Sequence, residues 1–240
     1  MIVSIYESTT TANEVAAAHF GRRLSHPATR TVMVAAGNTP LDLYQLISAQ
    51  GLKLPHLKVF ALDEYVGVPL EEPRNCANLL RHHVAQAWGL KPDQFLTVSS
   101  VAGEAERSVK QHESAIEAAG GLDLLVLGLG QNGHLGFNEP GSSPDSGARV
   151  LALDPISVEA NRKWFHGRFA PDQGVTVGMK TILGAREIFL LAFGAHKIQA
   201  VREMIRGSVS DRCPASFLQT HPRVKVFLDT TAAADLLTVS

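Results

Sequence analysis

The sequence predicts a single-domain α/β protein, with a Rossmann-like, doubly wound and mostly parallel sheet that has helices on both faces. Short apolar segments alternate with longer amphipathic segments along the whole chain. The apolar segments show little polar alternation, as is typical of parallel strands buried on both faces. Several of them run directly into glycine and polar residues, as strands do at the ligand-binding edge of such a sheet.

The predicted elements follow one another in strand-to-helix order. The predicted strands are short and mainly aliphatic, and they cover residues 1–6, 31–36, 58–62, 95–98, 124–127, 149–153, 187–193 and 224–228. The predicted helices cover residues 8–24, 41–46, 75–88, 104–119 and 156–165, and another helix follows Lys197 through Val201 and Ile205. Residues 179–183 are predicted as a short turn or helix. This alternation predicts crossover connections and therefore parallel strand pairing.

Composition places the chain among ordinary globular proteins. It has 240 residues, of which 45% are hydrophobic and 19% charged, enough for one sizeable core. No repeat or linker divides residues 1–240, so one domain is expected. The net charge of -1 argues against nucleic acid or an anionic membrane as partner.

Location and redox state are predicted from what the sequence lacks. We find no signal-peptide pattern and no apolar run long enough to span a membrane, so a cytoplasmic protein is expected. Cys76 and Cys213 lie far apart and form no CxxC pair. They are predicted to be free thiols in a reducing compartment, with no metal site or disulfide framework.

The most informative stretch is residues 122–146, LDLLVLGLGQNGHLGFNEPGSSPDS. The apolar segment 124–127 breaks into glycines, including Gly133, and His134 and Glu139 follow closely. Glycines let the backbone turn sharply and approach a ligand. The three glycines have the GxGxxG spacing of the dinucleotide-binding fingerprint, but no long helix follows at once, so the segment is not interpreted as that fingerprint. An ordinary strand-to-loop turn is the alternative interpretation.

A second candidate segment follows the strand over residues 31–36. It consists of Gly37, Asn38, Thr39 and Pro40, directly before a predicted helix. Proline suits a first helical turn, and the free amides and dipole of a helix N-terminus attract phosphate. The segment therefore predicts phosphate binding, with helix capping by Thr39 as the alternative.

Two further strand ends carry charged residues. Asp63 and Glu64 follow the strand over 58–62, where a carboxylate with a raised pKa can act as a general base. Helix capping by Asp63 is the alternative. Lys197 follows the strand over 187–193 at the start of a helix, where its charge opposes the helix dipole. That unfavourable position indicates a bound anion.

These motifs resemble one known family. The segments AAGNTPLDLY, LDEYVGVP, LGLGQNGHLGFNEPGSSPDS, GAHK and ASFLQTHP are similar, in order and spacing, to the glucosamine-6-phosphate deaminase (isomerase) family. The similarity spans nearly the whole chain. The wider superfamily includes 6-phosphogluconolactonase, and the combination of FNEPG with DEY points to the deaminase branch.

The resemblance implies a reaction without metal or cofactor, in which glucosamine 6-phosphate and water give fructose 6-phosphate and ammonia. It implies that Asp63 moves a proton from C2 to C1, and that His134 opens the sugar ring. Glu139 would orient and tune His134. Asn132 stands where the larger hexameric enzymes have aspartate, so it would orient the histidine by a hydrogen bond without a charge.

Further binding residues are implied by the same resemblance. A lid over residues 153–171 is expected to bring Lys163 to the phosphate, in the position of the family's lid arginine, with the neighbouring Arg162 as a possible substitute. The residues implied to hold the sugar phosphate from the loops are Gly37, Asn38, Thr39, Gly133 and Lys197. The larger enzymes' C-terminal extension is absent, so we expect a monomer or small homo-oligomer without N-acetyl-sugar-phosphate activation.

Three alternatives remain at this stage. Galactosamine-6-phosphate deaminases share LGLGxNGHLG, NEPG and PASFL, and the choice of C4 epimer depends on a few hydrogen bonds. A 6-phosphogluconolactonase is the second. A sugar-phosphate sensor on the same fold is the third, but a sensor needs no base, and this chain combines Asp63, His134 and Glu139 without a DNA-binding helix-turn-helix.

Overall fold

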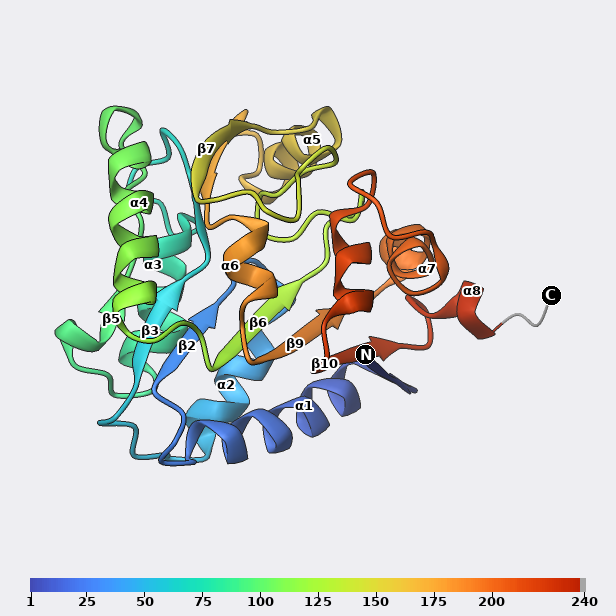
Figure 1. Ribbon diagram of the computed structural model, residues 1–240, viewed down its shortest axis with the longest axis horizontal. Helices are drawn as coiled ribbons and strands as arrows, with labels where there is room; N and C mark the ends of the chain where they lie inside the picture. The colour runs from blue at the N-terminus through green and yellow to red at the C-terminus, as the bar shows by residue number, and fades with distance from the viewer. Residues whose placement is uncertain (238–240) are drawn as a thin grey trace.

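The central sheet of the protein contains seven strands, all parallel (Figure 1). The computed structural model describes residues 1–237. In spatial order the strands are β1 (Ile2–Tyr6), β10 (Val224–Asp229), β9 (Glu187–Ala192), β6 (Leu124–Gly128), β2 (Thr31–Val34), β3 (Lys58–Ala61) and β5 (Phe95–Leu96). The predicted α/β class is confirmed, and the sheet is wholly rather than mostly parallel.

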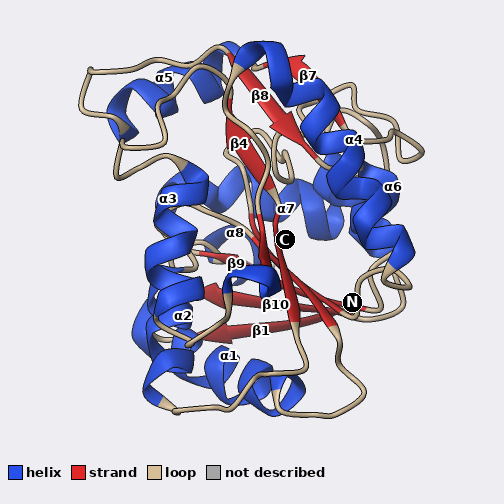
Figure 2. Ribbon diagram, turned by 90° about the vertical axis from the view of Figure 1, so that its left-hand side faces the viewer, coloured by secondary structure: helices blue, strands red, loops and turns tan. Residues whose placement is uncertain are grey.

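Helices cover both faces of this sheet. The helical elements are α1 (Thr9–Leu24), α2 (Leu41–Ala49), α3 (Cys76–Leu80), the π-helix η1 (Arg81–Gln86), η2 (Pro92–Gln94), α4 (Ala102–Ala118), α5 (Pro155–Trp164), α6 (Met179–Leu183), η3 (Ala195–Lys197), α7 (Ile198–Arg206), η4 (Pro214–Thr220) and α8 (Ala234–Leu237). Figure 2 shows α2 and α3 on one side of the strands and α4 and α6 on the other. Each face has its own buried apolar cluster, with Phe20 and Tyr44 in one and Met204 and Phe217 in the other.

The strand order reverses direction between β2 and β6. From β2 the chain adds β3 and β5 on one side, and after β6 it adds β9 and β10 on the other. The connections leaving such a switch point separate, which opens a crevice at the carboxyl ends of the strands. The loops after β2 and β6 carry Gly37 and His134, so this topology brings the two candidate segments together.

A second, antiparallel sheet stands above the carboxyl ends of the first (Figure 2). It contains β4 (Asp63–Tyr65), β8 (Gln173–Thr176) and β7 (Arg149–Ala152), in that order. Residues 149–153 were predicted as a strand, and the structure confirms a strand there, which belongs to this small sheet and not to the main one. Segments of three or four residues carry too little periodicity to identify their partner strand. In the structure, Val175 of β8 belongs to the same buried cluster as Val109 of α4.

Local chemistry explains several element boundaries. Ser8 starts α1 because its hydroxyl accepts a hydrogen bond from the Thr11 amide. Asn75 starts α3 in the same way, through the Asn78 amide. Within residues 1–237, no helix combines the length and apolar character needed to cross a membrane.

Candidate functional site

A cavity of about 230 Å³ opens at the carboxyl ends of β2, β3 and β6. Its wall includes Gly37 and Thr39 from the loop after β2, Asp63 from β4, His134 from the loop after β6, and Lys197 from η3. Residues of α5, at the top of the molecule in Figure 1, complete the wall. The fold thus gathers segments that are separated by up to 160 positions (37 to 197) around one space.

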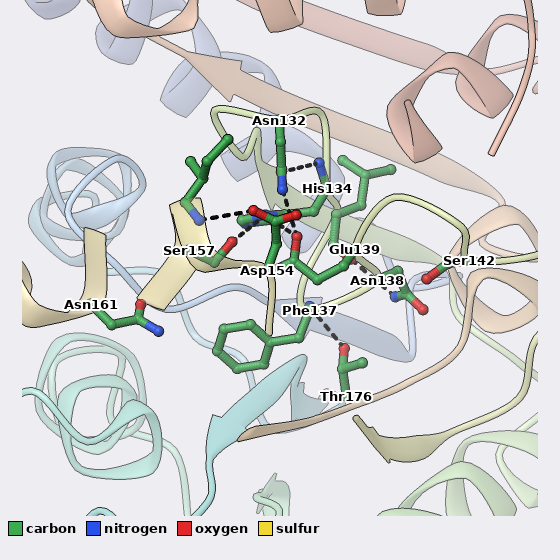
Figure 3. Close-up of polar contacts among 12 residues, drawn as sticks. Asn132, His134, Phe137, Asn138, Glu139, Ser142, Asp154, Ser157, Asn161 and Thr176 are labelled. Carbon is green, nitrogen blue, oxygen red and sulfur yellow. Dashed lines mark hydrogen bonds and ion pairs between the residues drawn. The ribbon is translucent and has the colours of Figure 1, made fainter. Parts of the chain in front are cut away.

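His134 is held by a carboxylate, an amide and a hydroxyl (Figure 3). Its Nδ1 lies 3.2 Å from Glu139 Oε2 and 3.3 Å from Ser157 Oγ. The Asn132 amide donates to the same Glu139 oxygen at 2.8 Å, and Asn132 Oδ1 accepts from the His134 backbone at 3.3 Å. Asn132 therefore orients His134 through its backbone and through Glu139.

This arrangement fixes which imidazole nitrogen carries the proton. Burial raises the pKa of Glu139, but hydrogen bonds and the charge of His134 outweigh it and leave the pKa below its ordinary value. Glu139 is therefore a carboxylate at neutral pH and only accepts hydrogen bonds. Nδ1 of His134 must donate to it, so Nε2 is the ring nitrogen left for proton transfer.

Asp63 and Glu64 point to different places, although they are adjacent in β4. Asp63 lines the cavity, and burial followed by the charge of Glu64 raises its pKa to about 8. Glu64 instead accepts backbone hydrogen bonds from Cys76 and Ala77 at 3.1 and 2.8 Å, at the start of α3. Burial raises the pKa of Glu64 to about 7. Asp63 lies in a strand, so the capping alternative for this residue is wrong.

The loop after β2 presents backbone rather than a side-chain cap. α2 begins at Leu41, and no side chain caps it, so the alternative role of Thr39 as a cap is wrong. Gly37 adopts a φ of 98°, which glycine tolerates best, and both Gly37 and Thr39 line the cavity. Asn38 is exposed and lies outside the cavity wall.

Lys197 lines the cavity from η3, the short helix that follows β9. Its side chain is half-buried, and burial lowers the pKa of the ammonium group to about 8. Within the described chain no carboxylate is ion-paired with it. A bound anion would stabilise this desolvated charge.

Besides Asn38, three more of the predicted binding residues lie away from the cavity wall. Arg162 and Lys163 are on the outer side of α5, 61% and 77% exposed, and each lies 3.6 Å from Glu159. Gly133 bonds Gly130 O through its amide at 3.1 Å, and its carbonyl accepts from Ala215 at 2.9 Å. Its backbone groups are thus already used within the protein.

The structure also adds residues that the sequence reasoning missed. Tyr65, Arg74, Ser157, Asn161 and Trp164 all line the cavity. A serine and an asparagine on a short helix carry no distinctive spacing, and Arg74 sits in an irregular loop. In residues 1–237, no group of three or more His, Cys, Asp or Glu side chains is arranged to hold a metal ion.

Gly130→Ala is expected to lower kcat by about a hundredfold, because small displacements of a catalytic group are costly. A Cβ at position 130 would overlap the imidazole of His134 and push it from Glu139. Gly103→Ala is the matched control, since a Cβ there meets open space. Steady-state kinetics on both variants check this, and an unchanged kcat in Gly130→Ala would show that the imidazole position does not matter.

Comparison with known proteins agrees with this geometry. A family model described as glucosamine-6-phosphate isomerases/6-phosphogluconolactonase matches residues 7–227. A glucosamine-6-phosphate deaminase of Cutibacterium acnes is 38% identical over 98% of this chain and 92% of its own length. One of Streptomyces avermitilis is 39% identical over 85% of this chain and 80% of its own length.

Solved structures show the same relationship. A monomeric glucosamine-6-phosphate deaminase superposes with a TM-score of 0.93 at 29% identity, covering 98% of this chain and 99% of its own. A 6-phosphogluconolactonase of Trypanosoma brucei superposes at 0.79 and 20% identity, over 98% of each chain, which shows a shared fold. The family model and the identity to the bacterial relatives confirm that the chain belongs to the family of glucosamine-6-phosphate isomerases and 6-phosphogluconolactonases.

Proposed function

We propose that the protein converts glucosamine 6-phosphate and water to fructose 6-phosphate and ammonia. The observation that carries this proposal is one cavity bordered by a carboxyl group of raised pKa, Asp63, and by a carboxylate-supported histidine, His134. The reaction needs a base at C2 and an acid–base group at the ring oxygen. The names of the two bacterial relatives and of the monomeric solved structure support the same assignment.

His134 opens the sugar ring. Its Nε2 takes the proton of the C1 hydroxyl and returns a proton to the ring oxygen as the bond from C1 to that oxygen breaks. The product is the open-chain aldehyde, in which the hydrogen on C2 is acidic. Glu139 stabilises the imidazolium formed between these steps, and Asn132 and Ser157 hold the pair in position.

Asp63 then carries out the isomerisation. Its carboxylate removes the C2 proton, the electron pair forms a C1–C2 double bond, and the aldehyde oxygen takes a proton. Return of the proton to C1 converts the enolamine to a C2 iminium ion. Water adds to C2 and ammonia leaves, giving the ketone of fructose 6-phosphate.

The phosphate provides the positioning that such proton transfers need. We assign it to the Gly37 and Thr39 loop and to Lys197, all of which line the cavity. Residues 153–171 act as a lid in this proposal, and its closure would carry Arg162 and Lys163 inward from their present outer position. Asn38 and Gly133 enter the binding set through the family resemblance, since they neither line the cavity nor lie in the lid.

The biological setting is proposed from the chemistry. An amino-sugar phosphate is the expected product of N-acetylglucosamine degradation, so a hydrolytic role in cytoplasmic N-acetylglucosamine catabolism fits. We expect a monomer or small homo-oligomer, in line with the monomeric solved relative. No cofactor enters the proposed steps.

The pH dependence follows from two groups that titrate close together. Asp63, with a pKa of about 8, must lose its proton to act as base, and Lys197, also about 8, must keep its proton to bind phosphate. We therefore expect kcat/KM to rise up to a maximum near pH 8 and to fall above it.

Lys197→Arg separates the two groups, because arginine stays charged over the whole range. The alkaline fall should move to higher pH, while the acidic rise remains. Ionisation of the substrate is common to both enzymes, so the difference between the two profiles reports on position 197. An alkaline limb that is unchanged in Lys197→Arg would assign it to another group.

Ammonia release from glucosamine 6-phosphate and from galactosamine 6-phosphate, measured in parallel, tests the proposed function. Hydrolysis of 6-phosphogluconolactone is the control reaction. Release from glucosamine 6-phosphate supports the proposal, and release from the galactosamine epimer alone would change the substrate. Lactone hydrolysis without ammonia release would replace the deaminase by a lactonase.

A further inference from the structure

We propose that Arg74 is a second cation, beside Lys197, that binds the phosphoryl group of the substrate. The inference rests on the proposed function, which supplies the sugar phosphate. Arg74 lies in the loop between β4 and α3, and no motif in the sequence singles it out. The proposed phosphate site therefore includes a residue from outside the loops that follow the strands of the main sheet.

The charged side chains on the cavity wall are the first observation that favours this proposal. Among residues 1–237, the lysine and arginine side chains on this wall are Lys197 and Arg74, and the acidic side chain is Asp63. Arg162 and Lys163 are directed to the outer side of α5, beside Glu159. A phosphate dianion entering the cavity therefore meets Arg74 without any movement of α5.

The guanidinium of Arg74 contacts an imidazole and an indole. Its Nη2 lies 2.6 Å from Nε2 of His166, and its charge lies over the Trp164 ring at 5.2 Å from the centroid. Within residues 1–237 no carboxylate forms an ion pair with it. A half-buried guanidinium without a counter-charge, on the wall of a substrate cavity, favours an anionic ligand.

The position of Arg74 places it on the phosphate-loop side of the cavity. The helices α2 and α3 both begin at the cavity, where Pro40 and Cys76 line its wall. Their following segments pack together, since the Trp88 indole donates to Tyr44 O at 3.1 Å. Arg74 precedes α3 as Thr39 precedes α2, so the two residues approach the cavity from neighbouring helix starts.

The two cations have complementary properties. Lys197 offers a compact charge, whereas the planar guanidinium of Arg74 can donate two parallel hydrogen bonds to phosphate oxygens. Trp164 and His166 belong to the lid segment 153–171, so the same guanidinium links phosphate binding to the position of the lid.

The test compares two ligands that differ only in the phosphate: the open-chain alditol of glucosamine 6-phosphate and the same alditol without phosphate. Their dissociation constants are measured by calorimetry on the wild type and on Arg74→Gln, Arg74→Lys and Arg81→Gln. Arg81→Gln is the matched control, because it removes the same charge from the adjoining helix outside the cavity. Inorganic phosphate, as a competitor, is a probe that does not depend on the sugar.

We expect Arg74→Gln to raise the dissociation constants of the phosphorylated alditol and of inorganic phosphate by about tenfold to a hundredfold. The dissociation constant of the unphosphorylated alditol should not change. Arg74→Lys should fall between, and Arg81→Gln should match the wild type. An equal loss for both alditols would overturn the proposal and leave Arg74 as a support for α5. Unchanged phosphate binding in Arg74→Gln would overturn it as well.

These outcomes are separable from failure of the proposed function, because binding is measured without turnover. A wild-type protein that binds phosphate through Arg74 but releases no ammonia would refute the deaminase activity and retain the anion site. If the wild-type protein releases ammonia and Arg74→Gln binds phosphate normally, the deaminase activity is supported and the anion site at Arg74 is refuted. Circular dichroism of each variant confirms that the comparison is made between folded proteins.

Discussion

Asp63→Asn is expected to lower kcat for ammonia release by about 10²- to 10⁴-fold, the range that general-base catalysis supplies. The amide has the shape of the carboxyl group but cannot take the C2 proton. At neutral pH burial keeps Asp63 mostly protonated, since its pKa is about 8, so a neutral amide should fit the same site. The dissociation constant of the phosphorylated alditol should therefore change little.

Glu64→Gln is the matched control for this variant. Glu64 is the neighbouring carboxyl group, but it bonds the start of α3 and does not line the cavity. We expect it to affect thermal stability more than turnover, apart from a lower pKa of Asp63 once the adjacent charge is gone. Near-wild-type turnover by Asp63→Asn would contradict the assignment of the base.

His134→Gln is expected to show the second large effect, and the effect should depend on the form of the substrate. With cyclic glucosamine 6-phosphate, loss of the ring-opening group should reduce kcat/KM by about 10²- to 10⁴-fold. With an open-chain analogue that lacks the ring-closing hydroxyl groups, the loss should be much smaller, because Asp63 is intact.

Ser157→Ala supplies the comparison for His134. It removes the hydroxyl that lies 3.3 Å from Nδ1 but keeps the bond to Glu139, so a modest loss on the cyclic substrate is expected. Equal losses of His134→Gln on cyclic and open-chain substrates would show that the histidine acts after ring opening.

The sequence was sufficient for the part of the site that parallel strands position. Gly37, Asp63, His134 and Lys197 each follow a strand of the main sheet, and the carboxyl ends of parallel strands converge. Strand identity and motif order could be read from the residues, so these four could be placed at one edge. Their convergence around a cavity confirms that placement.

The remainder depends on long-range packing that the sequence does not display. In the small sheet, β4 pairs with β8 across more than a hundred positions of sequence, for example Asp63 with Thr176. The direction of Arg162 and Lys163 depends on how α5 is rotated on its support. Arg74 lines the cavity and contacts Trp164 and His166, which lie about ninety positions further along the chain, and no local pattern encodes these contacts.

Asn132 shows the same limit at closer range. The sequence predicted that it would orient His134 by a hydrogen bond, and the structure shows such a bond to the His134 backbone. The sequence did not predict its shorter hydrogen bond, which the Asn132 amide donates to Glu139 at 2.8 Å. Because an amide here donates to the carboxylate, it helps to keep Glu139 ionised without adding a second negative charge.

The fate of the hydrogen on C2 tests the central claim most directly. Glucosamine 6-phosphate labelled with deuterium at C2 is converted by the wild-type protein, and the product is examined by nuclear magnetic resonance. The account predicts fructose 6-phosphate with the deuterium gone from C2 and present at C1 or in the solvent. A phosphorylated product that still carries deuterium on C2 would mean that nitrogen leaves without proton abstraction, and would contradict the role of Asp63.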